Sequence, residues 1–78
     1  MPRPPDPLMF AWRGGQVRVR HDDPALKPYS PRASVLLAAS TLASTPDGLE
    51  KILAATLGDH YRVRVRPGDP LEVALRRR

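Results

Sequence analysis

The chain has 78 residues, a formal net charge of +5 and no cysteine. A chain this short forms one domain that buries only about 60 to 65% of its unfolded surface, so a deep catalytic cleft is not expected. The lack of cysteine excludes disulfides and thiolate metal sites. The sequence pI near 10.8 favours polyanions as partners, although a GC-rich genome would give a similar excess of arginine without any binding function.

Residues 1–7 carry prolines at almost every second position, which remove amide donors and hold the backbone extended. They predict a flexible N-terminal arm, with the single domain occupying residues 8–78. No apolar stretch is long enough for a membrane span or a signal peptide. We therefore expect a cytoplasmic or virion-associated protein that makes no membrane contact.

A β-hairpin is predicted at the start of the domain. Two β-rich runs, Leu8–Trp12 and Gln16–Arg20, flank the turn residues Arg13, Gly14 and Gly15. Because successive side chains of a strand point to opposite faces, the apolar residues of both runs share one face. This predicted core face carries Leu8, Phe10, Trp12, Val17 and Val19.

Two helices are predicted next, after a proline-containing loop. Ser30 and Thr45 each precede a proline, which is typical of an N-cap followed by the first helical residue. The first helix is expected over residues 31–43 and the second over 46–57, ending at Gly58 in a left-handed conformation. Their apolar stripes are predicted to be Val35, Leu36, Ala39 and Leu42 in the first, and Leu49, Ile52, Leu53 and Leu57 in the second.

A second hairpin closes the chain. The run Tyr61–Arg66 alternates apolar residues with arginine, residues 67–70 contain two prolines and a glycine, and Leu71–Arg76 alternates again. The element order is ββααββ. The sequence therefore predicts an α+β fold, in which a four-stranded, largely antiparallel sheet carries the helix pair on one face.

The sheet face turned away from the helices is expected to be rich in arginine. It would carry Arg13, Arg18, Arg20, Arg62, Arg64, Arg66 and Arg76. Guanidinium groups hold phosphates bidentately, so we predict nucleic-acid binding by Arg18, Arg20, Arg62, Arg64, Arg66 and Arg76. The alternative is a solvated face on which arginines discourage aggregation.

The aromatic residues limit how nucleic acid could bind. Phe10, Trp12 and Tyr61 fall on the predicted core face, so the arginine side offers no platform for stacking bases. The remaining mode of binding is contact with the phosphate backbone of a DNA duplex or of structured RNA. Sequence specificity and the choice between DNA and RNA are not predicted.

Two further expectations, one about repulsion between arginines and one about a metal site, depend on whether the second and third strands pair. If they pair, Arg18 and Arg20 lie beside the arginines of residues 62–66 and repel them. An antiparallel pairing would also bring together the weak metal-ligand candidates His21, Asp23, Asp59 and His60. The same groups could supply a general base, but capping turns and charge balance are the stronger interpretation. We predict no catalytic residue and no cofactor.

Two local resemblances are present, and no family is assigned from them. Residues 58–65, followed by a turn and residues 71–73, resemble the paired strands of RelE-type ribonuclease toxins, although two strands precede the helices here. This resemblance implies an RNA-cleaving function without identifying a catalytic residue. Residues 45–53 and Gly58 resemble a helix of phage tail and contractile-injection baseplate proteins.

Three functions are therefore considered. The first is a small basic protein that binds DNA or RNA through phosphates. The second is a non-enzymatic structural or regulatory module, in the manner of a phage-encoded protein, that binds an acidic protein surface or forms a homodimer. A RelE-like ribonuclease is the third.

Overall fold

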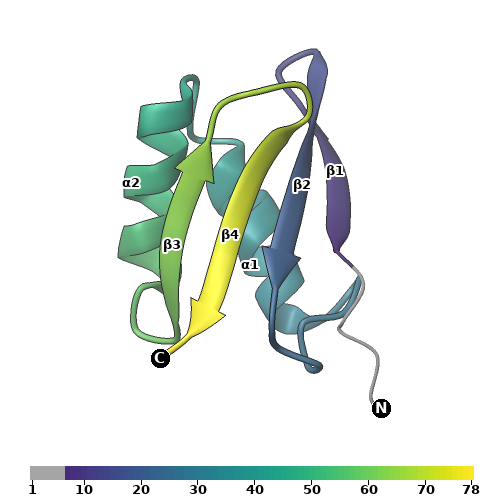
Figure 1. The fold of residues 1–78 in the computed structure, drawn as a ribbon, viewed down its shortest axis with the longest axis vertical. Helices are drawn as coiled ribbons and strands as arrows, with labels where there is room; N and C mark the ends of the chain where they lie inside the picture. The colour runs from purple at the N-terminus through teal and green to yellow at the C-terminus, as the bar shows by residue number, and fades with distance from the viewer. Residues whose placement is uncertain (1–6) are drawn as a thin grey trace.

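The computed structural model describes residues 7–78. The elements in chain order are β1 Leu8–Trp12, β2 Gly15–His21, α1 Pro31–Ser40, α2 Pro46–Leu57, β3 Tyr61–Arg66 and β4 Leu71–Arg77. Both helices lie on one side of the four strands (Figure 1), and no described element covers the other side. The predicted α+β class and element order are confirmed. The predicted arm, apart from Pro7, lies outside the described residues.

The sheet is mixed, with the strand order β1-β2-β4-β3. The pairs β1/β2 and β3/β4 are antiparallel hairpins, and β2 and β4 pair in parallel at the centre. The pairing of the second and third strands considered from the sequence is wrong, because β4 lies between them. This order is favourable electrostatically, since the outward residues of β4 include Glu72 and Ala74 and separate the two arginine-bearing strands.

A tight turn joins β1 to β2. Trp12 pairs with Gly15, so only Arg13 and Gly14 form the loop, with φ angles of 51° and 78°. Two residues at positive φ match the right-handed twist of a hairpin, and glycine adopts this conformation without steric cost. The turn directs Arg13 toward the helices.

Both helices begin as predicted. The Ser30 hydroxyl accepts a hydrogen bond of 3.2 Å from the Ala33 amide, and the Thr45 hydroxyl accepts one of 3.0 Å from Gly48. A proline follows each cap. These bonds satisfy amides that lack an intrahelical partner.

The first helix ends earlier than the sequence predicts, at Ser40 instead of Ala43. The Ser40 and Thr41 hydroxyls donate back to the carbonyls of Leu37 and Ala38, each over 2.7 Å. The Trp12 indole N–H donates to the Ser40 carbonyl over 2.9 Å. The last carbonyls of a helix have no intrahelical donor. Here the Trp12 side chain of β1 supplies a donor to one of them.

The buried stripe of α1 also differs from the prediction, and Leu42, which was predicted to belong to it, lies beyond the end of the helix. Val35 is 43% exposed and Leu42 is 76% exposed. The helix instead turns Ala33, Leu36 and Ala39 into the core, where the small side chains allow close approach. In α2 the predicted stripe is confirmed, and Ile52 is the only member that stays partly buried.

Gly58 ends α2, but not in the left-handed conformation that was expected. Its φ of −64° and ψ of −20° are right-handed. The position requires glycine for a different reason, because a Cβ there would clash with the carbonyl oxygen of Ala54.

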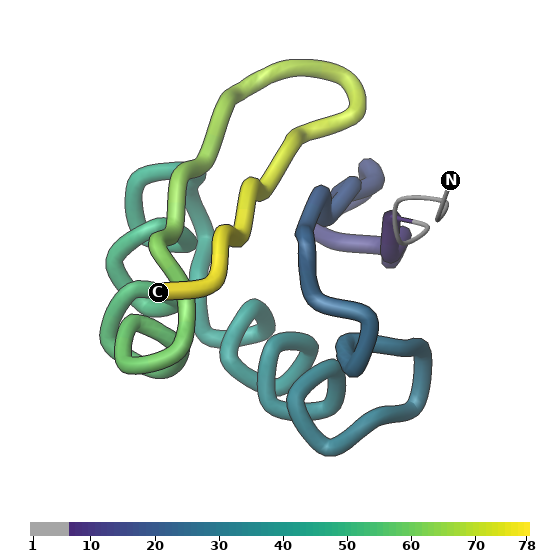
Figure 2. Tube along the Cα trace, turned by 60° about the horizontal axis from the view of Figure 1, so that its bottom comes forward, coloured from purple at the N-terminus to yellow at the C-terminus, as the bar shows by residue number. Residues whose placement is uncertain are grey.

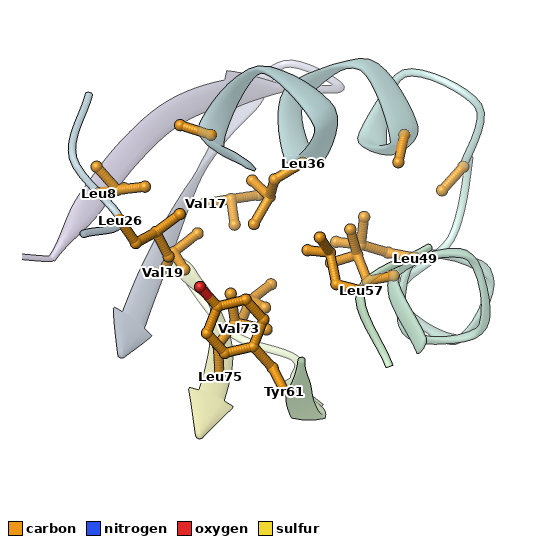
Figure 3. Close-up of a cluster of buried hydrophobic side chains, with 14 of the residues drawn as sticks. Leu8, Val17, Val19, Leu26, Leu36, Leu49, Leu57, Tyr61, Val73 and Leu75 are labelled. Atoms are coloured by element: carbon orange, nitrogen blue, oxygen red, sulfur yellow. The ribbon is translucent and has the colours of Figure 1, made fainter. Parts of the chain in front are cut away.

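The core lies between the sheet and the helices (Figure 3). Its strand residues are those predicted from the alternation, with Phe10 and Trp12 packed at its margin. Tyr61 is fully buried, and its ring lies beside Val73 and Leu75 with the hydroxyl pointing toward the side where Val19 and Leu26 lie.

Candidate nucleic-acid interface

The sheet face opposite the helices forms a surface that we call the arginine face. It comprises Arg18 and Arg20 of β2, Arg62, Arg64 and Arg66 of β3, and Glu72, Ala74 and Arg76 of β4. Each of the six arginines is exposed, and the apolar residues between them point into the core. In Figure 2, α1 lies below the strands and α2 lies to their left, beside β3.

The arrangement of the arginine face follows from the strand register. Glu72 lies between Arg18 and Arg66. Ala74 lies in the same way between Arg20 and Arg64. Arg62 lies directly opposite Arg76 on the neighbouring strand. Residues that lie side by side on neighbouring strands thus form rows across the face. Glu72 and Ala74 stand at the centre of two of these rows and interrupt the positive charge there.

Most of these arginines have no anion among the described residues to neutralise them. Arg20 approaches Glu72 at 4.0 Å, which is a weak contact between a side chain 69% exposed and one 27% exposed. Within residues 7–78, no hydrogen bond or ion pair engages the guanidinium groups of Arg18, Arg62, Arg64, Arg66 and Arg76. Like charges on adjacent strands raise the local positive potential, which an external anion would lower.

The charge of the whole chain is concentrated on this face. The arginine face holds six arginines and one glutamate, while the remaining sequence holds seven basic and seven acidic residues. The formal net charge of +5 is therefore the charge of the arginine face alone. A generally basic composition would not produce this distribution.

A shallow groove of about 750 Å³ crosses the arginine face. Ala74, a small residue between two arginine-bearing strands, is one of the residues that line it. Its walls include Arg20, Arg64, Arg66 and Arg76, and two carboxylates, Glu72 and Asp22, also line it. The Asp22 carboxylate accepts a hydrogen bond of 3.0 Å from the Arg77 amide and lies 3.6 Å from the Arg77 guanidinium.

Arg13, Arg77 and Arg78 lie outside the face and have structural contacts. Arg13, which the sequence placed on the arginine face, instead donates through Nε to the Ala43 carbonyl over 2.9 Å. That prediction is wrong because the residue lies in the turn, where strand alternation no longer applies. Arg77 contacts Asp22, and Arg78 donates to the Gly58 carbonyl over 2.6 Å. Of the three C-terminal arginines, only Arg76 belongs to the arginine face.

The weak metal-ligand candidates lie at one end of the sheet, but an arginine stands among them. Arg32 of α1 has Nη1 3.3 Å from Asp23 Oδ2 and Nη2 3.4 Å from His60 Nδ1. His21 accepts a hydrogen bond of 3.2 Å from the Asp23 amide. Among residues 7–78, no three carboxylate, histidine or cysteine side chains are grouped to hold a metal ion. The guanidinium of Arg32 supplies the positive charge at this place.

Asp23, Arg32 and Tyr61 form a polar cluster beneath this end of the sheet. The Tyr61 hydroxyl and Arg32 both donate to Asp23 Oδ2, and the Ala25 amide donates to Oδ1 over 2.9 Å. The hydrogen bond from Tyr61 is the main reason that the pKa of Asp23 lies below its ordinary value. Burial raises the pKa of Tyr61, and the hydrogen bond that Arg32 donates to the Tyr61 hydroxyl raises the pKa of Arg32.

Sequence reasoning missed Arg32 and the Tyr61 hydroxyl. Tyr61 was assigned to the core from its strand position, which is correct for its ring but does not indicate a partner for its oxygen. Arg32 lies in the first turn of a helix, where a basic residue is electrostatically unfavourable. That unfavourable placement is the one sequence signal that could have pointed to a specific contact.

Comparison with known proteins gave no match among protein-family models, curated proteins or solved structures. Within residues 7–78, no helix is both long and apolar enough to cross a membrane.

Proposed function

We propose that this protein binds nucleic acid by contacting backbone phosphates through the arginine face. One observation carries the proposal, namely that the entire formal net charge lies on one exposed sheet face. Guanidinium groups form bidentate hydrogen bonds with phosphate oxygens, and most of those on this face have no competing carboxylate in the part of the chain that the structure describes.

Duplex or structured nucleic acid is the expected ligand. Tyr61 is buried, Phe10 and Trp12 pack against the core, and Tyr29 lies in the loop before α1. The described arginine face therefore has no aromatic ring on which an unpaired base could stack, a contact that contributes about 1–3 kcal/mol per base in single-strand binders. In a duplex the bases are already stacked, and only the phosphates need partners.

The test is fluorescence anisotropy with a labelled random-sequence DNA duplex, an RNA duplex and a single strand of the same length. Neutralisation of about five phosphates predicts a slope near −4.5 for log K against log salt, which is about a 500-fold loss of affinity between 50 and 200 mM salt. The variant Arg62→Gln/Arg64→Gln should flatten the slope by about two units.

A matched control separates a local surface from total charge. Lys27→Gln/Lys51→Gln removes the same charge from two exposed residues of the loop and α2. This variant should bind almost as the wild type does. Equal losses in both double variants would contradict the proposal, because attraction would then depend on net charge alone. Absence of binding at 50 mM salt would also contradict it, and an acidic protein surface would become the next partner to test.

A further inference from the structure

We infer that one duplex backbone strand lies along β4, with a phosphate held over Ala74 between Arg20 and Arg64, and that Glu72 ends this path. The inference rests on the proposed function. It identifies which part of the arginine face binds phosphate, whereas the charge distribution alone treats the six arginines as equivalent.

The position over Ala74 suits a phosphate, because the only carboxylate contact there is the weak approach of Arg20 to Glu72 at 4.0 Å among the described residues. Arg20 and Arg64 flank it from the two neighbouring strands, and their backbones are about 9–10 Å apart because two strand spacings separate them. Long arginine side chains can converge from this separation on one group between them. The methyl side chain of Ala74 leaves the groove open at that point.

The row on one side of Ala74 extends the path. Arg76 is two residues further along β4, about 6.7 Å away, and has Arg62 opposite it on β3. Neither guanidinium has an anionic partner within residues 7–78. The nearby Asp22 lies on the β2 side and is already engaged by Arg77. A following phosphate would therefore bind on the β3 side of this row.

The row on the other side of Ala74 ends the path. Glu72 occupies its centre, between Arg18 and Arg66, and 27% of its side chain is exposed. A carboxylate at this point repels a phosphate, and the guanidinium that it approaches is that of Arg20, at 4.0 Å. Arg66 lines the groove and lies opposite Glu72 in the register, so we expect this carboxylate to repel a phosphate beside Arg66.

Two matched double variants test the position of the path. Arg20→Gln/Arg64→Gln and Arg18→Gln/Arg66→Gln each remove one charge from β2 and one from β3. With a labelled 16-base-pair DNA duplex, the first should lose about 60-fold in affinity at 0.1 M salt, because each of the two guanidinium groups removed lowers the salt slope by about one unit. The second should lose less than about eightfold, the value for one contact.

Two single variants test the roles of β4 residues. Glu72→Gln should bind about eightfold more tightly at 0.1 M salt, with a slope steeper by about one unit, because a further phosphate can bind in its row. Ala74→Leu fills the groove without changing charge and should lose about eightfold or more, whereas attraction by charge alone predicts no change. Thermal unfolding of each variant establishes that it is folded at the assay temperature.

The outcomes distinguish this inference from the proposed function. If the wild type binds but both double variants lose equal affinity, phosphates bind across the whole face and only the inference fails. Unchanged affinity of both Glu72→Gln and Ala74→Leu would likewise overturn it alone. If the wild type does not bind the duplex at 50 mM salt, the proposed function fails and the path over Ala74 fails with it.

Discussion

The hydroxyl of Tyr61 on β3 donates a hydrogen bond of 2.5 Å to the Asp23 carboxylate, which lies 38 residues earlier in the loop after β2. Tyr61 is fully buried and Asp23 is 5% exposed. A buried carboxylate is costly unless it is hydrogen-bonded and paired, and here the hydroxyl, Arg32 and the Ala25 amide meet that need. The cluster therefore fixes the loop before α1 against the edge strand of the sheet.

Tyr61→Phe should lower the free energy of unfolding by about 1.5–3 kcal/mol, the usual value for a hydrogen bond to a charged group. The ring is retained, so core packing is unchanged, and only the hydroxyl is lost, which donates to Asp23 and accepts from Arg32. Urea denaturation measures the effect. Tyr29→Phe is the matched control, because Tyr29 is 98% exposed and should show no loss. Equal stability of both variants would show that the bond to Asp23 makes no net contribution.

Acid should destabilise the protein through Asp23. The hydrogen bond from Tyr61 sets the pKa of Asp23 below its ordinary value of 3.8. A carboxyl group with a lowered folded-state pKa contributes stability that is present above 3.8 and is lost as the pH falls through the folded-state pKa. Urea midpoints measured from pH 6 to pH 2 should fall more steeply for the wild type than for Asp23→Asn.

Asp59→Asn is the control for this acid transition, because Asp59 is exposed. Its urea midpoints should decline with pH as those of the wild type do. An Asp23→Asn profile parallel to the wild-type profile would contradict the assignment of the acid transition to Asp23.

Alkali should destabilise the protein through Tyr61. Burial raises the pKa of Tyr61 above the ordinary value of 10.0, so the group contributes stability that is present below pH 10 and lost as the pH rises through the folded-state pKa. In Tyr29→Phe, Tyr61 is the only tyrosine, and its ionisation can be followed by ultraviolet absorbance. The expected midpoint lies above pH 10. A midpoint at or below 10 in the folded protein would contradict the burial of its hydroxyl.

Local patterns predict the elements of this fold but not their order in the sheet. Both hairpins and both helix starts follow from turn residues, caps and periodicity within a few residues of each other. The parallel pairing of β2 with β4 joins segments that are 54 residues apart, as in the register of Val17 with Leu71 and Val19 with Val73. No local signal specifies that contact. The only indication of the strand order is that the outward residues of β3 are all arginine, whereas those of β4 include Glu72 and Ala74. Placing β4 between β2 and β3 lowers the repulsion between their arginines.

For the arginine face as well, local patterns predict the direction of side chains within a strand but not the features that depend on the strand order. Alternation within β2, β3 and β4 correctly predicts which arginines leave the core, because the pleat fixes side-chain direction. It fails for Arg13 in a turn and does not apply to Arg78 after β4, where contacts with Ala43 and Gly58 orient the side chains. The groove over Ala74 could not be predicted at all, since it depends on which strand is central.

Arg13 and Arg18 are both exposed arginines of the first hairpin, but only Arg13 should contribute to the stability of the fold. Arg13→Ala removes the hydrogen bond to the Ala43 carbonyl in the connection between the helices. A loss of about 1 kcal/mol is expected, which corresponds to a fall of about 4–8 °C in the melting temperature of a domain this size. Arg18→Ala removes a side chain that has no hydrogen bond or ion pair within residues 7–78, so its melting temperature should stay within about 2 °C of the wild-type value. Equal melting temperatures of the two variants would show that Arg13 does not hold the hairpin turn against the helices.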